Sequence, residues 1–322
     1  ADTAATSTAA STTPLTAEQV IAQAKKSTVY ILANRTDGNL ASGSGTVVDK
    51  AAGLIITNNH VAGAAEKLQV RTDDMKRPVP AKLIAALPCD DLALIQIEDV
   101  ADRAQFEQVA LGDSTTLKAG ETVFTVGFPG AADNVTDFTS ANISIANGIV
   151  SKSETVFDIP GSDVVPLQSV IQHTAATNPG NSGGPLFNEF GQQVGVNTAG
   201  GGGKELQDYS ITMARVLSLL DRMKSGYSSK WIGASLEVAF DSQQQPLGLT
   251  VGGLAPFGPA DKANLVPGQL IAYINRRRTT TLKDYCENMP DRPNTKVRVT
   301  MFDPQSNKLF NVVLRSGLKP AA

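Results

Sequence analysis

The stretch Gly180-Asn181-Ser182-Gly183-Gly184-Pro185 constrains the fold of this chain more than any other. It places a serine among glycines, where backbone N–H groups can crowd around the side-chain oxygen. A serine hydroxyl is a weak nucleophile at neutral pH, so it needs a base to take its proton and a third group to orient that base. The chain has only two histidines, His60 and His173, and both precede Ser182. The fold must therefore bring an earlier histidine to a later serine.

His60 and Asp91 are the best partners for Ser182. His60 closes an apolar run over residues 53–60, and Asp91 opens a second apolar run over residues 91–97. A strand that ends in polar residues can present a side chain to a cleft. His173 lies inside a predicted strand without a motif of its own, which favours a structural or surface role. Asp90 competes with Asp91, but the apolar run directly after Asp91 favours Asp91 as the buried orienting group.

The order of these residues separates two serine-hydrolase architectures. Gly180, Ser182 and Gly184 also satisfy the nucleophile-elbow pattern of α/β-hydrolases. That fold needs its histidine after the serine, and no histidine follows Ser182. The order histidine, aspartate, serine is the order of chymotrypsin. The elbow interpretation is therefore excluded.

Length and composition predict a mainly β chain of more than one domain. The 322 residues exceed what one core usually supports, and hydrophobic residues make up 41%. Short apolar runs broken by Gly, Pro and Asn outnumber long helical patterns. The net charge of −3, with both signs mixed along the chain, argues against a nucleic-acid or acidic-membrane partner. The single basic run, residues 276–278, is read as a solvated turn.

Other sequence features bear on location and covalent structure. No apolar stretch approaches the length of a membrane span, and no signal-peptide pattern is present. The chain begins with Ala rather than Met, which fits a processed, exported form. Cys89 and Cys286 lie far apart in the sequence and in different predicted domains, so we expect no disulfide between them.

The pattern along the chain predicts two six-stranded β-barrels. Residues 1–15, rich in Ala, Thr and Ser, are expected to form a disordered tail, and residues 16–225 the domain that carries the candidate triad. A capping-box pattern at residues 16–19 predicts a helix over residues 17–26, and residues 215–224 have helical spacing. The first six predicted strands are 28–33, 43–49, 54–57, 68–71, 81–87 and 92–97. The second six are 121–127, 140–151, 170–174, 185–187, 193–197 and 209–212.

A smaller α/β domain is predicted over residues 226–317, after a linker at residues 225–229. Short strands are expected from residue 231 onward, with a C-terminal tail over residues 318–322. The longer predicted elements of this domain are helices at 259–263 and 282–289 and strands at 269–274, 296–302 and 309–314. A triad divided between two barrels places the cleft at their interface, where ligand sites commonly form.

Three motifs together resemble the HtrA/Deg family of chymotrypsin-fold serine proteases. They are Thr57-Asn58-Asn59-His60-Val61, Asp91-Leu92-Ala93-Leu94-Ile95 and Gly180-Asn181-Ser182-Gly183-Gly184-Pro185-Leu186. The resemblance runs from about residue 16 to residue 314. It implies an extracytoplasmic, periplasmic or cell-envelope role in protein quality control, unfolded polypeptide substrates, and a homotrimer or a multiple of trimers. The chain departs from the family pattern at His173 and Thr174, where many relatives have Thr-Asp.

The C-terminal region is similar to a PDZ domain. Trp231-Ile232-Gly233-Ala234 stands where the family has its carboxylate-binding loop, which implies that Ile232, Gly233 and Ala234 capture peptide C-termini and that bound peptides regulate the protease. Gln269 and Arg276 replace the usual Asp and Gly of the PDZ core.

The expected roles in the site follow from the triad. Ser182 attacks, His60 transfers the proton, Asp91 holds the imidazole, and the loop Gly180, Asn181 and Ser182 forms the oxyanion hole. Thr198, Ala199 and Gly200 are expected to bind substrate, and Ala176 to form the base of the first specificity pocket. No acidic residue lies between His173 and Ser182, so small or medium apolar side chains should be preferred there. No cofactor or metal is predicted.

Two further expectations remain open at this point. The same scaffold could hold unfolded chains without cutting them, so a binding protein is the alternative to a hydrolase. Asn181 stands where trypsin-like zymogens have an aspartate that pairs with a new N-terminus. Without that charge, the loops near the serine, including the glycine run 200–203, should be ordered by substrate, peptide or a neighbouring subunit.

Overall fold

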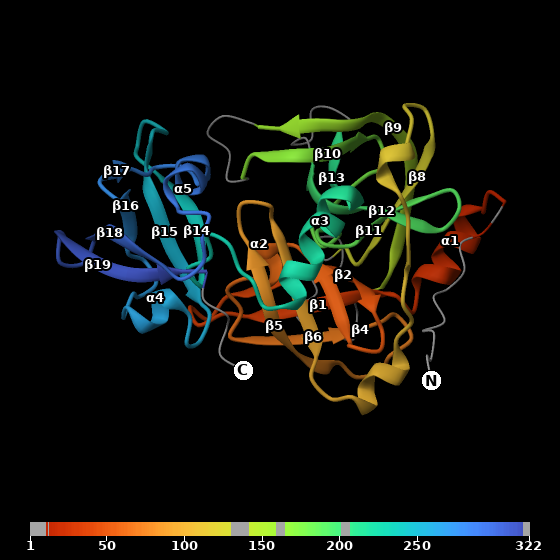
Figure 1. The fold of residues 1–322 in the computed structure, drawn as a ribbon, viewed down its shortest axis with the longest axis horizontal. Helices are drawn as coiled ribbons and strands as arrows, with labels where there is room; N and C mark the ends of the chain where they lie inside the picture. The colour runs from red at the N-terminus through yellow and green to blue at the C-terminus, as the bar shows by residue number, and fades with distance from the viewer. Residues whose placement is uncertain (1–10, 12, 130–141, 159–164, 201–206, 318–322) are drawn as a thin grey trace.

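The structure is a computed structural model of the 322-residue chain (Figure 1). It describes residues 11, 13–129, 142–158, 165–200 and 207–317. The predictions for residues 1–10 and 12 of the N-terminal tail, for glycines 201–203 and for the tail 318–322 therefore lie outside the described residues.

The first barrel closes from six antiparallel strands, as predicted. Its order is β1-β2-β3-β6-β5-β4, and each strand begins and ends within a few residues of the predicted bounds. Alternate apolar side chains, among them Val29, Val47 and Ile95, fill the interior. The strands are β1 (Thr28–Asn34), β2 (Leu40–Asp49), β3 (Leu54–Thr57), β4 (Lys67–Arg71), β5 (Val79–Leu87) and β6 (Leu92–Ile97).

The second barrel follows in the chain and also has six antiparallel strands. They run in the order β11-β8-β9-β10-β13-β12, and pairing between β11 and β12 closes the ring. A short strand that was not predicted, β7 (Ala110–Leu111), adds to β12 in parallel. The six strands are β8 (Thr122–Gly127), β9 (Ser144–Phe157), β10 (Leu167–His173), β11 (Pro185–Asn188), β12 (Gln192–Gly200) and β13 (Asp208–Thr212).

Short helices lie on and between the barrels. The predicted capping box at Thr16 is present and begins α1 (Ala17–Ala24). Before it, the Leu15 N–H donates to the Glu189 carbonyl at 2.7 Å, so ordered contacts begin earlier than the predicted end of the tail at residue 15. Helix α3 (Met213–Lys224) buries Val216, Leu220 and Met223 against the core shared by the barrels. The remaining helices are α2 (Asn59–Ala62), η1 (Ala101–Gln105) and η2 (Ser114–Thr116).

The C-terminal module is a separate sheet with two helices, seen on the left of Figure 1. Its strand order is β14-β15-β16-β18-β19, with β17 paired to β16, and its own core includes Leu249, Ile271 and Val299. This agrees with the predicted small α/β domain. The elements are β14 (Ala234–Phe240), β15 (Pro246–Leu254), α4 (Pro259–Lys262), β16 (Leu270–Ile274), β17 (Arg277–Arg278), α5 (Leu282–Asn288), β18 (Thr295–Asp303) and β19 (Lys308–Ser316).

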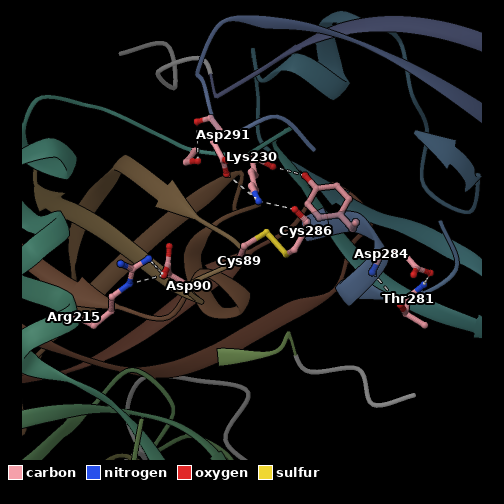
Figure 2. Close-up of a disulfide and its surroundings, with 10 residues drawn as sticks. Cys89, Asp90, Arg215, Lys230, Thr281, Asp284, Cys286 and Asp291 are labelled. Carbon is pink, nitrogen blue, oxygen red and sulfur yellow. Dashed lines mark hydrogen bonds and ion pairs between the residues drawn. A yellow bond between two sulfur atoms is a disulfide. The ribbon is translucent and has the colours of Figure 1, made fainter. Parts of the chain in front are cut away.

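The expectation that Cys89 and Cys286 do not pair is wrong. The two residues form a disulfide with Cα atoms 5.7 Å apart, although 197 positions separate them in the sequence (Figure 2). Cys89 lies in the turn between β5 and β6, and Cys286 lies on α5. The prediction took separation in sequence and in domain for separation in space. The module folds back against the first barrel, so α5 meets the turn that leads to Asp91.

Hydrogen bonds also join the module to the first barrel. The Trp231 Nε1–H donates to the Gly63 carbonyl at 2.8 Å, and the Leu254 N–H donates to Thr36 Oγ1 at 2.7 Å. Trp231 is buried at this junction. Within the described residues, no helix combines the length and the apolar character needed to cross a membrane.

Candidate active site

His60 stands on the short helix α2, directly after the buried strand β3. Its Nδ1 lies 2.9 Å from Asp91 Oδ2 and 3.1 Å from Asp91 Oδ1, and its backbone N–H donates to the same Oδ1 at 3.1 Å. An ionised carboxylate only accepts hydrogen bonds, so Nδ1 carries the proton and Nε2 is left with its lone pair. The ring keeps 50% of its side-chain surface exposed, and Nε2 can therefore receive a proton from a neighbouring hydroxyl.

Asp91 is the buried aspartate of the adjacent pair, and the structure resolves the ambiguity with Asp90. Besides His60, its carboxylate accepts the Thr198 hydroxyl at 2.7 Å. The Asn58 amide donates to its backbone carbonyl at 2.9 Å. Asp90 points elsewhere and pairs with Arg215 at 2.6 and 2.8 Å. Asp91 also holds a φ of 48°, a left-handed conformation that a non-glycine residue adopts only when its surroundings enforce it.

The environment of His60 favours its charged form. Partial removal of the ring from water lowers the pKa, but the charge of Asp91 and its hydrogen bond outweigh this effect. The nearby Arg35 charge acts in the opposite direction to Asp91. The net result is a pKa of His60 above its ordinary value of 6.5.

The rate of proton transfer to His60 should therefore rise with pH through a midpoint above 6.5. A general base must be neutral, and a raised pKa keeps the ring protonated to a higher pH. We expect this limb in the pH profile of kcat/KM for a short reporter peptide. Arg35→Met should move the limb to still higher pH, because it removes a charge that lowers the pKa. A wild-type midpoint below 6.5 would contradict the dominance of Asp91.

Ser182 lies on the loop that precedes β11, and Ser44 of β2 fixes that loop from the first barrel. The Ser44 N–H donates to the Ser182 carbonyl at 2.8 Å, and the Ser44 hydroxyl donates to the Gly180 carbonyl at 2.7 Å. The Thr57 hydroxyl in turn donates to the Ser44 carbonyl at 2.7 Å. Thr57 stands three residues before His60, so this chain of bonds joins the serine loop to the histidine strand.

Gly183 shows why glycine is needed beside the serine. It has a φ of +84°, and a Cβ there would lie 2.2 Å from Thr57 Oγ1 and 2.3 Å from the Ser44 carbonyl oxygen. The close approach of the two barrels therefore depends on the missing side chain. This is the physical basis of the glycine-rich pattern from which the sequence prediction began.

Two N–H groups of the serine loop have no acceptor among the described residues. The Asn181 N–H donates to the Asn178 carbonyl at 2.9 Å, and the Gly183 N–H donates to the Asn197 carbonyl at 2.8 Å. Among the described residues, the N–H groups of Gly180 and Ser182 have no acceptor. Asn181 was included in the predicted oxyanion hole, but its N–H is occupied within the loop. Gly180 and Ser182 are the donors that remain.

The Ser182 hydroxyl makes no hydrogen bond within the described part of the chain, including none to His60. Apo active sites often have loose catalytic contacts that tighten with substrate. The three predicted residues are nevertheless joined through their neighbours. Thr198 of β12 bonds Asp91, and Ser44 links the Ser182 loop to Thr57.

The other predicted substrate residues meet different outcomes. The Thr198 side chain is turned to Asp91, a role in orienting the carboxylate that the sequence prediction missed. Ala176 is exposed, and its carbonyl accepts the Thr125 hydroxyl at 2.8 Å. Ala199 and Gly200 form the end of β12, where they pair with Tyr209 and Asp208.

Asp208 was also missed. It lies opposite Gly200 on one side and opposite His173 on the other. Burial raises the pKa of its carboxyl to about 6, against the hydrogen bond from the backbone of Thr177. Thr177 follows Ala176, the predicted base of the first pocket. An acidic group therefore reaches this region from β13, although none lies between His173 and Ser182 in the sequence.

His173 has the structural role that was favoured for it. It is buried, its Nε2 lies 2.9 Å from Ser210 Oγ, and Ser210 donates to Asn197 at 2.9 Å. Burial lowers the pKa of His173 to about 4, so the ring is neutral near pH 7. Asn197 accepts the Gly183 N–H through its carbonyl. His173 is thus linked to the serine loop through Ser210 and Asn197.

The predicted carboxylate-binding loop borders the same cavity as the His60–Asp91 pair. The cavity has a volume of about 510 Å³ and is lined by residues of the barrel and of the module, including His60, Asp91, Ile232, Ala234, Leu282 and Tyr285. Gly233 has a φ of +75°. The N–H groups of Ile232 and Gly233 have no acceptor among the described residues, whereas Ala234 begins strand β14 beside Leu254.

Comparison with known proteins agrees with this geometry. Residues 43–196 match the model of the trypsin-like peptidase domain. A probable periplasmic serine endoprotease DegP-like of Pseudomonas fulva (strain 12-X) is 34% identical over 292 residues, covering 87% of this chain and 56% of that protein. A protein of the same name in Ectopseudomonas mendocina (strain ymp) is 36% identical over 285 residues, covering 84% and 56%. The chain belongs to the HtrA/Deg family of serine proteases. It spans about half the length of the curated relatives it matches.

A solved structure supports the fold of this HtrA/Deg chain. The HtrA-type protease AlgW with tripeptide superposes with a TM-score of 0.54 at 22% identity, covering 95% of this chain and 98% of that one. The likeness therefore includes the C-terminal module as well as the barrels. The curated relatives are periplasmic by name, in agreement with the extracytoplasmic location predicted from the sequence.

Proposed function

We propose that this HtrA/Deg chain is a serine endopeptidase that cleaves unfolded or misfolded polypeptides. Ser182 is the nucleophile, His60 the general base and Asp91 the orienting carboxylate. The observation that carries the proposal is the hydrogen-bond chain from Thr198 through Asp91 to Nδ1 of His60, which leaves Nε2 as the proton acceptor. Membership of a serine protease family supports the same function.

The residues define each step of the reaction. Ser182 Oγ attacks the scissile carbonyl while its proton passes to His60 Nε2, and Asp91 stabilises the imidazolium that forms. The N–H groups of Gly180 and Ser182 donate to the tetrahedral oxyanion. When the intermediate collapses, His60 gives the proton to the leaving amine. Water, deprotonated by His60, then hydrolyses the ester on Ser182 and restores the hydroxyl.

Labelling with a fluorophosphonate tests this proposal directly, because only an activated serine reacts. Wild type and Ser218→Ala should incorporate one label, whereas Ser182→Ala should incorporate none. Ser218 is an exposed residue of α3 and serves as the matched control. The same set of proteins should be compared for cleavage of casein. An unlabelled wild type that nevertheless binds casein would favour the alternative of a non-proteolytic binding protein on the same scaffold.

Specificity at the first pocket should depend on pH. Ala176 favours small or medium apolar side chains such as Val, as the sequence predicts, but Asp208 lies beside the neighbouring Thr177. Below pH 6 the Asp208 carboxyl is mostly neutral, and above it a charge becomes available to pair with a basic side chain.

We therefore expect the ratio of kcat/KM for Lys and Val reporter peptides to rise about five- to tenfold between pH 5 and pH 8, since one ion pair of this kind contributes on the order of 1 kcal/mol. Using a ratio removes the titration of His60, which both substrates share. Asp208→Asn should abolish the rise. A ratio that changes equally in Asp208→Asn would exclude Asp208 from the pocket.

The wider role follows the family resemblance. We propose that the protein works outside the cytoplasm in protein quality control, as a homotrimer or a multiple of trimers. The module is proposed to be a PDZ domain that captures peptide C-termini at Ile232, Gly233 and Ala234. The N–H groups of Ile232 and Gly233, which have no acceptor among the described residues, would donate to the carboxylate. Asn181 is buried and uncharged, in keeping with activation that does not depend on a new N-terminus.

A further inference from the structure

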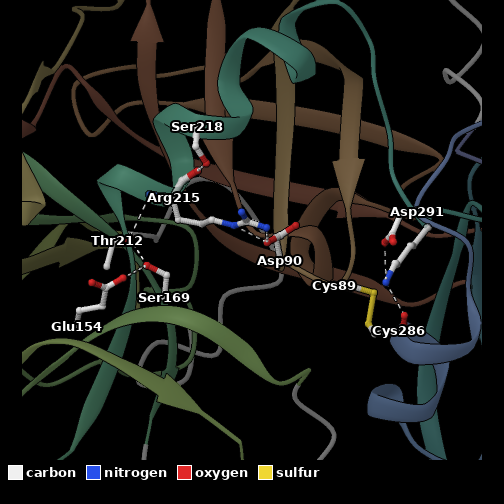
Figure 3. A network of polar contacts seen from close by, with 10 residues as sticks. Cys89, Asp90, Glu154, Ser169, Thr212, Arg215, Ser218, Cys286 and Asp291 are labelled. Atoms are coloured by element: carbon white, nitrogen blue, oxygen red, sulfur yellow. Dashed lines mark hydrogen bonds and ion pairs between the residues drawn. A yellow bond between two sulfur atoms is a disulfide. The ribbon is translucent and has the colours of Figure 1, made fainter.

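The segment that carries Asp91 is held at three consecutive residues, each by a different element. Figure 3 shows the first two, Cys89 and Asp90, with their partners Cys286 and Arg215. Cys89 is bonded to Cys286 of α5, and Asp90 is paired with Arg215 of α3 at 2.6 and 2.8 Å. Asp91 then bonds His60. Because Asp91 holds a left-handed φ of 48°, its position depends on these neighbours rather than on intrinsic backbone preference.

The module also supports His60. Helix α2 ends at Gly63, and the carbonyl of Gly63 accepts the Trp231 Nε1–H at 2.8 Å. The carbonyl of His60 itself accepts Arg35 Nη2 at 2.9 Å, and the Arg35 side chain packs against Gly253 of β15. The C-terminal module therefore contacts the segments that carry both His60 and Asp91.

Helix α5 connects this support to the peptide-binding side of the module. Leu282 and Tyr285 of α5 line the 510 Å³ cavity that His60 and Asp91 also line. Lys230, directly before Trp231, donates through Nζ to the Cys286 carbonyl at 2.6 Å. A movement of α5 would thus pass through one disulfide to Cys89, two residues before Asp91.

The disulfide is open to small thiols. Cys89 and Cys286 are only partly buried, and both line a second cavity of about 500 Å³ between the barrels and the module. The charged side chains of Asp90, Arg215 and Lys230 line this second cavity. It is distinct from the first cavity, which His60 and Asp91 line. A dithiol can therefore reach the bond without entering the active site.

We propose that the C-terminal module holds the His60–Asp91 pair in position through the Cys89–Cys286 disulfide and Trp231. Reduction of the disulfide by a dithiol ends this positioning. The inference rests on the proposed protease function. A thiolate of the dithiol attacks one sulfur and forms a mixed disulfide, and the other sulfur leaves as a thiolate that takes up a proton. The second thiol of the reductant then closes its own disulfide and frees the remaining cysteine. The protein gains two thiols, and the dithiol loses two electrons and two protons.

The test compares the oxidised full chain, the same protein after treatment with dithiothreitol, and the double variant Cys89→Ser/Cys286→Ser. The readouts are kcat/KM against pH for a short peptide, and the rate of fluorophosphonate labelling of Ser182. Loss of the anchor should lower kcat/KM by about ten- to hundredfold, because small misplacements at a catalytic centre have effects of this size. It should also move the acid limb down toward pH 6.5, since the charged groups that act on His60 are Asp91 and Arg35 and the contact with Asp91 would loosen.

Each outcome decides something different. If the double variant has the same limb and rate as the oxidised protein, the positioning role is excluded while the protease function stands. If oxidised protein is neither labelled nor active, the proposed function itself fails. If dithiothreitol still lowers the activity of the double variant, the effect does not come from the Cys89–Cys286 disulfide, and this part of the proposal is rejected. Trp231→Phe keeps an aromatic ring but loses the Nε1–H, and it should shift the acid limb in the same direction. If its free energy of unfolding equals that of wild type, the shift comes from lost positioning and not from a less stable fold.

Discussion

Replacement of Ser182 by Ala is expected to lower kcat by roughly 10⁵- to 10⁶-fold. The variant keeps the oxyanion donors of Gly180 and of the alanine at position 182 but has no oxygen to attack the substrate. The Ser182 hydroxyl makes no hydrogen bond within the described residues, so its removal should leave the loop and the free energy of unfolding nearly unchanged. Initial rates on casein and on a peptide reporter, with far-UV CD and thermal unfolding on the same samples, measure both expectations.

The matched control is Ser218→Ala, a substitution on the exposed face of α3 that should retain full activity. Residual activity of Ser182→Ala within a factor of ten of the parent would reject Ser182 as the nucleophile. A large loss accompanied by unfolding would have to be repeated with Ser182→Cys, which retains a nucleophile and a similar volume. The thiol of Ser182→Cys should then react with an alkylating peptide even where the turnover of that variant is low.

The sequence predicted the parts of this molecule that depend on local patterns. Apolar runs located the twelve strands of the barrels, and the capping box at Thr16 began α1 where it was expected. His60, Asp91 and Ser182 could be selected because each follows or precedes a recognisable run. Gly183 could be expected from its motif, and the structure adds the reason: the space for its side chain is taken by Thr57 and Ser44.

The parts that the sequence did not reveal are contacts between distant strands and turns. The bond from Thr198 to Asp91 joins residues 107 positions apart, and Ser44 reaches Gly180 across 136 positions. No local pattern identifies which hydroxyl lies opposite which acceptor once two barrels have closed. The same holds for Asp208, whose place opposite Gly200 depends on the register of β12 and β13.

The prediction that Cys89 and Cys286 are not paired was wrong for the same reason, although the sequence held a signal for the disulfide. Cys89 immediately precedes the two aspartates, one of which was already selected for the site, and the chain has one other cysteine. In an exported protein, two cysteines are more often paired than free. The prediction rested on separation along the sequence and between predicted domains, and domains joined by a short linker can pack face to face.

Replacement of Asp91 by Asn is the second large effect, with an expected loss of about 10⁴-fold in kcat. An amide can donate as well as accept, so it can face His60 Nδ1 with an N–H and favour the tautomer that places the proton on Nε2. That tautomer cannot take the proton of Ser182. The Thr198 hydroxyl, which donates to the Asp91 carboxylate at 2.7 Å, would also compete for the single amide oxygen.

The pH profile separates this mechanism from simple misfolding. With the Asp91 charge removed, partial burial and the Arg35 charge are left, and both lower the pKa of His60. The acid limb of Asp91→Asn should therefore move to lower pH than in wild type, even as the plateau falls. Asp90→Asn is the informative neighbour: it breaks the pair with Arg215 without touching His60, so its plateau should stay within about tenfold of the parent. If both variants lost the same activity and neither moved the acid limb, the segment would contribute only to the fold, and the role of the Asp91 charge would be excluded. A limb that shifts in Asp91→Asn alone would assign the charge next to His60 to Asp91.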